Sequence, residues 1–97
     1  MVTKTVEESC YRIESNRLDV YSAASLEEDM TSILEKGVTS LYLDFSNVEE
    51  VSSSVLGLLL YKKMVYGKQG VRLLLINVNP QIQKILKILN LNSHLLL

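Results

Sequence analysis

The chain has 97 residues, of which 47% are hydrophobic, and this supports one compact domain because two cores of half that size would each be marginal. Its 10 basic and 11 acidic residues give a formal charge of -1, which argues against binding to nucleic acid or to an anionic membrane surface. One cysteine, Cys10, and one histidine, His94, allow neither an internal disulfide nor a cysteine and histidine metal site. The first residues lack the apolar segment of a signal peptide, and no apolar run approaches the ~20 residues of a membrane span. We therefore expect a cytoplasmic protein without a cofactor, a metal or a membrane-inserted segment.

The first residues are β-prone. Residues 2–15 alternate apolar and polar side chains over part of their length, which predicts a strand or hairpin with a turn at Glu7 and Glu8. Residues 18–20 are long enough only for the end of a strand. This places Asp19 at a junction between elements.

The apolar pattern becomes helical from Ser22. The apolar residues of one helical face are Leu26, Met30, Ile33 and Leu34. Either Ser22 or Ser25 can cap this helix, and Ser25 with Glu28 fits a capping box. Gly37 suits the left-handed residue after its end.

Two further apolar segments are predicted to be strands, and each is followed by a loop or helix start. Residues 38–45 form a buried strand with a loop after it, and residues 71–78 are almost continuously apolar, as in a central strand covered on both faces. Asn79 and Pro80 then suit the cap and first position of a last helix. Its expected inward residues are Ile82, Ile85, Leu86 and Leu89, with Asn90 ending it. The tail from residue 93 is apolar enough for a short last strand.

Three consecutive serines, Ser52, Ser53 and Ser54, begin an apolar segment that continues to Tyr66. Its length of about 13 residues favours a helix over a strand. At least one of the serines is expected to cap this helix, with Ser54 preferred. The other hydroxyls fit a phosphorylation site, because a phosphate at a helix N-terminus meets free N–H groups and the positive end of the helix dipole.

The serine helix is also predicted to carry a contact surface. At about 100° per residue, Val55, Leu59 and Tyr66 fall between Lys62 and Lys63, on the side that the lysines mark as facing solvent. We expect these three apolar residues to form an exposed strip for a protein partner, called the outer strip below. The alternative is a helix that is buried almost all round.

No catalytic arrangement emerges from the polar residues. Asp19 and Asp44 could form an acidic pair. The sequence has neither a second histidine nor a metal-ligand pattern, so we expect them to be solvated or capping carboxylates. His94 could in principle activate a serine, yet the chain lacks a G-x-S-x-G elbow. The alternation of strands and helices predicts a largely parallel sheet, in which functional groups collect where a strand leads into a helix. The serine step lies at such a junction.

Residues 16–23, N-R-L-D-V-Y-S-A, are followed by residues 41–48, L-Y-L-D-F-S-N-V, and residues 51–57, V-S-S-S-V-L-G. In this order they resemble three segments of the STAS domain, the fold of the bacterial anti-sigma-factor antagonists. The first family pattern is G-E-L-D-x-x-x-A. The second is an apolar strand followed by D-(L/F)-S-x-V, and the third is I-D-S-S-G-L-G. Where the last pattern has an aspartate and its first glycine, this chain has Ser52 and Val55.

The resemblance covers residues 1–97 as one STAS domain. It implies an α/β fold with a four- to five-stranded, mostly parallel sheet and three to four helices packed against it. It also implies a binding module and not an enzyme: the unmodified protein binds an anti-sigma factor that is a serine kinase, and phosphorylation of Ser53, the matching acceptor, releases it. A phosphatase is a further implied partner.

The predicted contact surface joins the serine step to the outer side of its helix. Its residues are Asp19, Ser52, Ser53, Ser54, Val55, Leu59, Lys62 and Tyr66. The alternative function is a STAS module that is not phosphorylated, either a scaffold in a signalling complex or the cytoplasmic subunit of a lipid ABC transporter.

Overall fold

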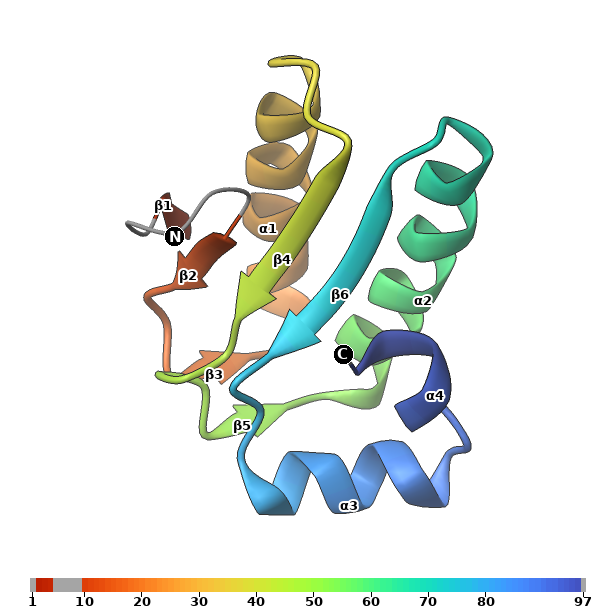
Figure 1. Ribbon diagram of the computed structural model, residues 1–97. Coiled ribbons are helices and arrows are strands. Elements are labelled where there is room, and N and C mark those ends of the chain that lie inside the picture. Colours follow the sequence, from red (N-terminus) through yellow and green to blue (C-terminus); the bar gives the residue numbers. More distant parts are fainter. Residues whose placement is uncertain (1, 5–9, 97) are drawn as a thin grey trace.

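The structure is a computed structural model that describes residues 2–4 and 10–96. Within these ranges the chain forms a four-stranded sheet in the order β1-β2-β4-β6 (Figure 1). Its strands are β1 (Val2–Lys4), β2 (Cys10–Ile13), β4 (Ser40–Asp44) and β6 (Arg72–Ile76). β1 is antiparallel to β2, whereas β2, β4 and β6 are parallel. The predicted hairpin is therefore present, and its predicted turn at Glu7 and Glu8 lies outside the described residues.

Two further strands form a separate small sheet. These are β3 (Arg17–Leu18) and β5 (Glu50–Val51), which pair in parallel. β5 occupies the end of the segment that was predicted to be a loop. Because β3 leads into one helix and β5 into another, this pairing fixes the starts of both helices.

Four helices are described, and two of them are long. They are α1 (Val20–Leu34), α2 (Ser53–Lys68), α3 (Pro80–Ile88) and α4 (Asn92–Leu95). Figure 1 shows α1 and α2 running along the length of the sheet, with α2 beside β6, and α3 lying across the end of the sheet where β4 and β6 finish. α2 contacts β6 and α1, and α4 contacts α2 and β6.

The core is formed by apolar side chains of the strands, of the helices and of the loop after β4. Its largest fully buried members are Phe45, Ile13, Leu18, Leu26, Met30, Leu41, Leu43, Leu56, Leu59, Leu73, Leu75 and Ile82. In β6 three consecutive leucines are buried, which is the near-continuous pattern of a strand covered on both faces. β6 is nevertheless the last strand of the sheet and not a central one, with only a single bridge from Leu75 to Leu96 beyond it.

The first helix begins earlier than the sequence predicts. Asp19 is its N-cap, and one carboxylate oxygen accepts hydrogen bonds from the backbone N–H groups of Tyr21 and Ser22. Ser22 completes a capping box with Asp19, so the predicted capping roles of Ser22 and Ser25 are wrong. Aspartate caps as well as serine does, and β3 brings Asp19 to the point where the helix starts.

The last helix follows the prediction at its ends but not along its whole face. Asn79 caps α3, Pro80 occupies its first turn, and Asn90 has a positive φ of 61°. Ile82 and Leu86 are buried, whereas Ile85 and Leu89 are exposed in part. The short helix α4 stands where the tail strand was predicted. Beyond it, Leu96 alone among the described residues forms a bridge to β6.

Candidate functional site

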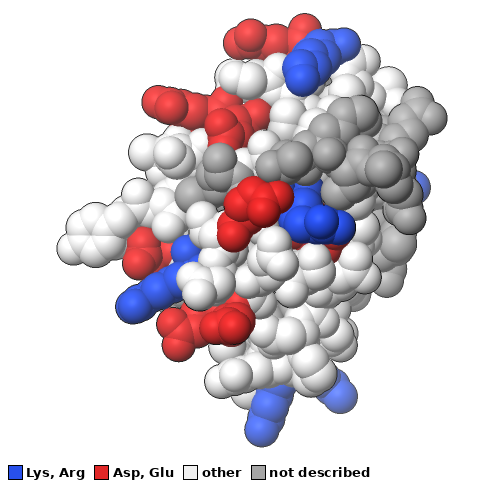
Figure 2. All heavy atoms as spheres, turned by 90° about the vertical axis from the view of Figure 1, so that its left-hand side faces the viewer, with Lys and Arg blue, Asp and Glu red and all other residues white. Residues whose placement is uncertain are grey.

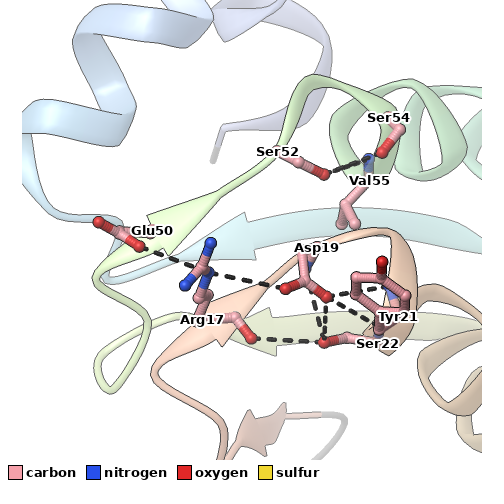
Figure 3. A network of polar contacts seen from close by, with 8 residues as sticks. All are labelled: Arg17, Asp19, Tyr21, Ser22, Glu50, Ser52, Ser54 and Val55. Atoms are coloured by element: carbon pink, nitrogen blue, oxygen red, sulfur yellow. Dashed lines mark hydrogen bonds and ion pairs between the residues drawn. The ribbon is translucent and has the colours of Figure 1, made fainter.

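The starts of α1 and α2 lie side by side. Leu18 pairs with Val51 in the small sheet, and the Ser52 backbone N–H donates to the Leu18 carbonyl oxygen at 2.8 Å. The residues that follow each strand, Asp19 and Ser52, are the N-caps of the two helices. The predicted site residues at this end of the molecule therefore converge on one region, which Figure 3 shows.

The three serines have different roles. The Ser52 hydroxyl accepts a hydrogen bond from the Val55 backbone N–H at 3.3 Å, which makes Ser52 the N-cap of α2. The Ser54 hydroxyl lies 2.9 Å from the Ser52 hydroxyl (Figure 3). The preference for Ser54 as the cap is therefore wrong, because β5 ends at Val51 and the helix starts one residue after Ser52.

Ser53 occupies the first position of α2. Its side chain is exposed, and no described residue forms a hydrogen bond with its hydroxyl. Ser52 meanwhile satisfies the N–H group that a cap must bind. The side chain of Ser53 therefore has no part in the cap.

Acidic and basic side chains line the approach to this region. Arg17 Nε lies 3.6 Å from Asp19 Oδ2 and 3.6 Å from Glu50 Oε2. The Arg17 side chain reaches across the small sheet between the two carboxylates (Figure 3). Because the arginine and Glu50 are mostly exposed, these pairs position the side chains but contribute little to stability.

The outer strip is not exposed, and this prediction is wrong. Val55, Leu59 and Tyr66 are 0%, 0% and 4% exposed, so their side chains belong to the core. The prediction took Lys62 as a marker of solvent. In the structure the Lys62 ammonium instead lies 2.9 Å from Glu27 on α1, with only 18% of its side chain exposed. This lysine marks the boundary between two helices and not the solvent side of α2.

The exposed face of α2 lies elsewhere and begins at the serines. Gly57, Tyr61 and Met64 follow Ser53 and Ser54 along one side of the helix, with Tyr61 60% and Met64 62% exposed. We call these five residues the α2 ridge. Their spacing of three or four residues places them on one helical face. A glycine inside the helix was the signal for this face, because a glycine on a core face would leave a gap.

Two titratable groups lie inside the α1 and α2 layer. The hydrogen bond that the Lys62 ammonium donates to the Glu27 carboxylate raises the pKa of Lys62. Burial raises the pKa of Tyr66, whose hydroxyl has no hydrogen-bond partner among the described residues. An unpartnered buried hydroxyl is uncommon and destabilises the fold relative to a phenylalanine of the same shape.

Asp44 and Asp19 do not form an acidic pair, since each has its own partners. Asp44 is buried and accepts hydrogen bonds from the Ser46 backbone, Asn77 and Arg12 at 2.9, 3.2 and 3.3 Å. Burial alone would raise the pKa of Asp44, but these hydrogen bonds outweigh it and lower the pKa below 3.8. The carboxylate therefore joins the ends of β2, β4 and β6 in its ionised form.

Within residues 2–4 and 10–96 the structure does not bring the metal and catalytic candidates together. No group of three histidine, cysteine or acidic residues in these ranges could hold a metal ion. His94 is exposed on α4, and no hydrogen bond links it to a serine in the described part of the chain. None of the described helices is long and apolar enough to cross a membrane.

Comparison with known proteins identifies the family through a model that covers the chain. The family model described as STAS domain matches residues 1–97. Anti-sigma-B factor antagonists of Staphylococcus aureus strains NCTC 8325 and COL are 25% identical over 93 residues, which cover 95% of this chain and 86% of theirs.

Two solved structures share the fold. The anti-sigma factor antagonist SpoIIAA in its unphosphorylated form has a TM-score of 0.77 and 18% identity, over 99% of this chain and 84% of its own. The NMR structure of the protein TM1081 also has a TM-score of 0.77, with 20% identity, over 94% of this chain and 74% of its own.

Proposed function

The chain belongs to the STAS domain family, and we propose that it is an anti-sigma-factor antagonist that works by binding and not by catalysis. In this proposal the unmodified protein binds an anti-sigma factor that is also a serine kinase. Phosphorylation of Ser53 then releases that partner, and a phosphatase restores the binding form. The curated relatives named above are anti-sigma-B factor antagonists, which supports this class of partner and a cytoplasmic location.

The observation that carries the proposal is the division of labour among the serines. Ser52 caps α2, and Ser54 contacts Ser52, while Ser53 is exposed at the first helical position. A phosphate there would add about two negative charges close to the positive end of a 16-residue helix. The fold would tolerate the modification, and its effect would fall on whatever binds at this surface.

Val55 does not obstruct this position. It replaces the first glycine of the family pattern, and its side chain is fully buried beneath the start of α2. A kinase approaching Ser53 would therefore meet the serine hydroxyl and not a branched side chain. Ser52 stands where the family pattern has an aspartate. The cap of α2 is not weakened by this difference, because serine caps a helix as effectively as aspartate does.

The α2 ridge is the contact surface that we propose in place of the outer strip. Gly57 lies in its middle, and a Cβ added there would meet no atom within 4 Å. The fold does not require this glycine, yet glycine inside a helix costs about 1 kcal/mol relative to alanine. A partner backbone that packs closely against α2 at this point accounts for it, with Tyr61 and Met64 as apolar contacts.

Phosphorylation would act on this surface through charge. A phosphate on Ser53 would lie within one turn of Gly57 and would be desolvated by a partner seated on the α2 ridge. A charge buried without a counter-charge costs several kcal/mol, which is enough to weaken a micromolar interaction to about millimolar. Asp19, Ser52 and Ser54 border the same surface, and Lys62 lies between it and α1.

The proposal can be tested with an anti-sigma factor kinase encoded beside this protein. Incubation with that kinase and ATP should place phosphate on Ser53 by mass spectrometry and none on Ser53→Ala. In calorimetry with the same kinase, Ser53→Asp should weaken binding at least tenfold, whereas Ser93→Asp, the same change at an exposed serine on α4, should not. Phosphate at another residue would refute the switch.

One observation favours a second function, a STAS module without a switch. Two of the three serines already have hydrogen bonds within the chain, so the serine step has a structural role of its own. Such a module would serve as a scaffold or as the cytoplasmic subunit of a lipid ABC transporter. Unchanged partner binding by Ser53→Asp would favour it.

A further inference from the structure

A groove lies next to the α2 N-cap, where the small sheet meets α3. Its volume is about 310 Å³. Leu18 and Ile82 line it and are each 1% exposed, so part of its lining is apolar. Ser52 also lines the groove, which makes it continuous with the region around Ser53. We call this cavity the α3 groove.

One wall of the α3 groove continues as an exposed apolar surface. Ile85 lines the groove and is 37% exposed, and Ile88, one turn further along α3, is 73% exposed. α3 packs on the core through Ile82 and Leu86 and leaves these two isoleucines to solvent. Exposed isoleucines beside a groove form a surface that an apolar side chain of another protein can cover.

The other side of the α3 groove is acidic. Asp19, Glu49 and Glu50 line it, against a single cationic side chain, Arg17. Arg17 lies 3.6 Å from two of these carboxylates, and no ion pair within the described ranges includes Glu49. Figure 2 views the molecule from the side of β3 and shows acidic side chains on both sides of a basic one in its lower left part.

The charges are unevenly distributed along the sequence, and Glu49 and Glu50 lie where this distribution changes. All 11 acidic residues lie at or before Glu50, and six of the 10 basic residues follow it. Glu49 and Glu50 are therefore the last two acidic residues of the chain. With Asp19 they outnumber Arg17 in the lining, and this negative balance would favour the approach of a cationic segment.

We propose that the α3 groove binds a segment of a partner protein in which a lysine or arginine precedes an apolar side chain. The cation lies among Asp19, Glu49 and Glu50, and the apolar side chain packs on Ile85 and Ile88. An acidic segment would be repelled by the carboxylates. A purely apolar segment would remove water from the carboxylates and offer them no new hydrogen bond or counter-charge, which is unfavourable. The inference extends the proposed function, on which it rests for a protein as the occupant.

The test is an amide NMR titration of the whole chain with two blocked tetrapeptides. One peptide has the sequence Leu-Arg-Ala-Leu, and the other has glutamate in place of the arginine. The arginine peptide should shift amides within residues 17–19, 49–52 and 81–85, and the glutamate peptide should not. Neutralising Glu49→Gln and Glu50→Gln together should weaken binding about fivefold. Ile85→Ser should also weaken it.

A matched control removes the same charge elsewhere. Glu28→Gln with Glu35→Gln neutralises two exposed carboxylates, one on α1 and one at its C-cap, and should leave the affinity unchanged. Equal weakening by both double variants would mean unspecific attraction and would overturn the proposal, as would shifts confined to the α2 ridge or no shifts at all. The titration contains no kinase or anti-sigma factor, so its failure would leave the Ser53 experiment untouched. A failed Ser53 experiment with a positive titration would remove the switch and keep the groove.

Discussion

Replacing Gly57 by alanine should make the fold more stable and the partner interaction weaker. The φ of Gly57 is not in the positive range, and an added Cβ would lie in open space, so alanine fits without strain. The gain in helix propensity is about 0.5–1 kcal/mol, which corresponds to a rise in melting temperature of roughly 2–8 °C for a domain of this size. Thermal unfolding followed by circular dichroism measures this gain.

The same methyl group should obstruct a partner that packs on the α2 ridge. An extra methyl in a close-packed contact typically costs 1–3 kcal/mol, so we expect Gly57→Ala to weaken binding of the anti-sigma factor at least about fivefold by calorimetry. Gly67→Ala is the matched control, because Gly67 is also in α2 with open space around its Cα. It lies ten residues, or about 15 Å, further along the helix and should not affect binding. If Gly57→Ala is more stable but binds the partner unchanged, no partner backbone packs closely against Gly57. If Gly57→Ala is less stable, the space around the Gly57 Cα is not open.

Three further changes test the fold around the site. Ser52→Ala should lower the unfolding free energy by about 1 kcal/mol in urea titrations, because it removes the α2 cap, whereas Ser54→Ala should change it by less than about 0.5 kcal/mol. Tyr66→Phe should leave the melting temperature unchanged or raise it, since the lost hydroxyl has no partner among the described residues; a clear decrease would reveal a hydrogen bond there. The lowered pKa of Asp44 means that its stabilising effect is present above pH 3.8 and is lost as the pH falls through the folded-state value. Asp44→Asn should therefore reduce the difference in stability between pH 6 and pH 3, and an unaltered difference would assign acid sensitivity to other carboxylates.

Local chemistry made much of the fold predictable. Asn79 and Pro80 specify the start of α3 by themselves, because the cap and the first helical position each need a particular residue type. The order of strands and helices predicted the mostly parallel sheet, and the three matching segments predicted the STAS family, which the family model confirms. These features depend on neighbouring residues or on long patterns.

The misplaced site residues depended on contacts between distant parts of the chain. Three serines in a row offer similar caps, and the hydrogen bond from Ser52 to Leu18 decides among them. α2 is apolar on nearly every side, so its periodicity could not reveal which face turns outward. Lys62 misled the prediction because its partner, Glu27, is on another helix.

The small sheet of β3 and β5 joins the starts of α1 and α2 through strands of two residues each. The ladder is short, but Leu18 in β3 is a buried core residue, so the pairing is held by core packing as well as by hydrogen bonds. When it opens, both helix N-termini lose their anchor at the same moment. Ser53 and the α3 groove would then respond as one cooperative unit.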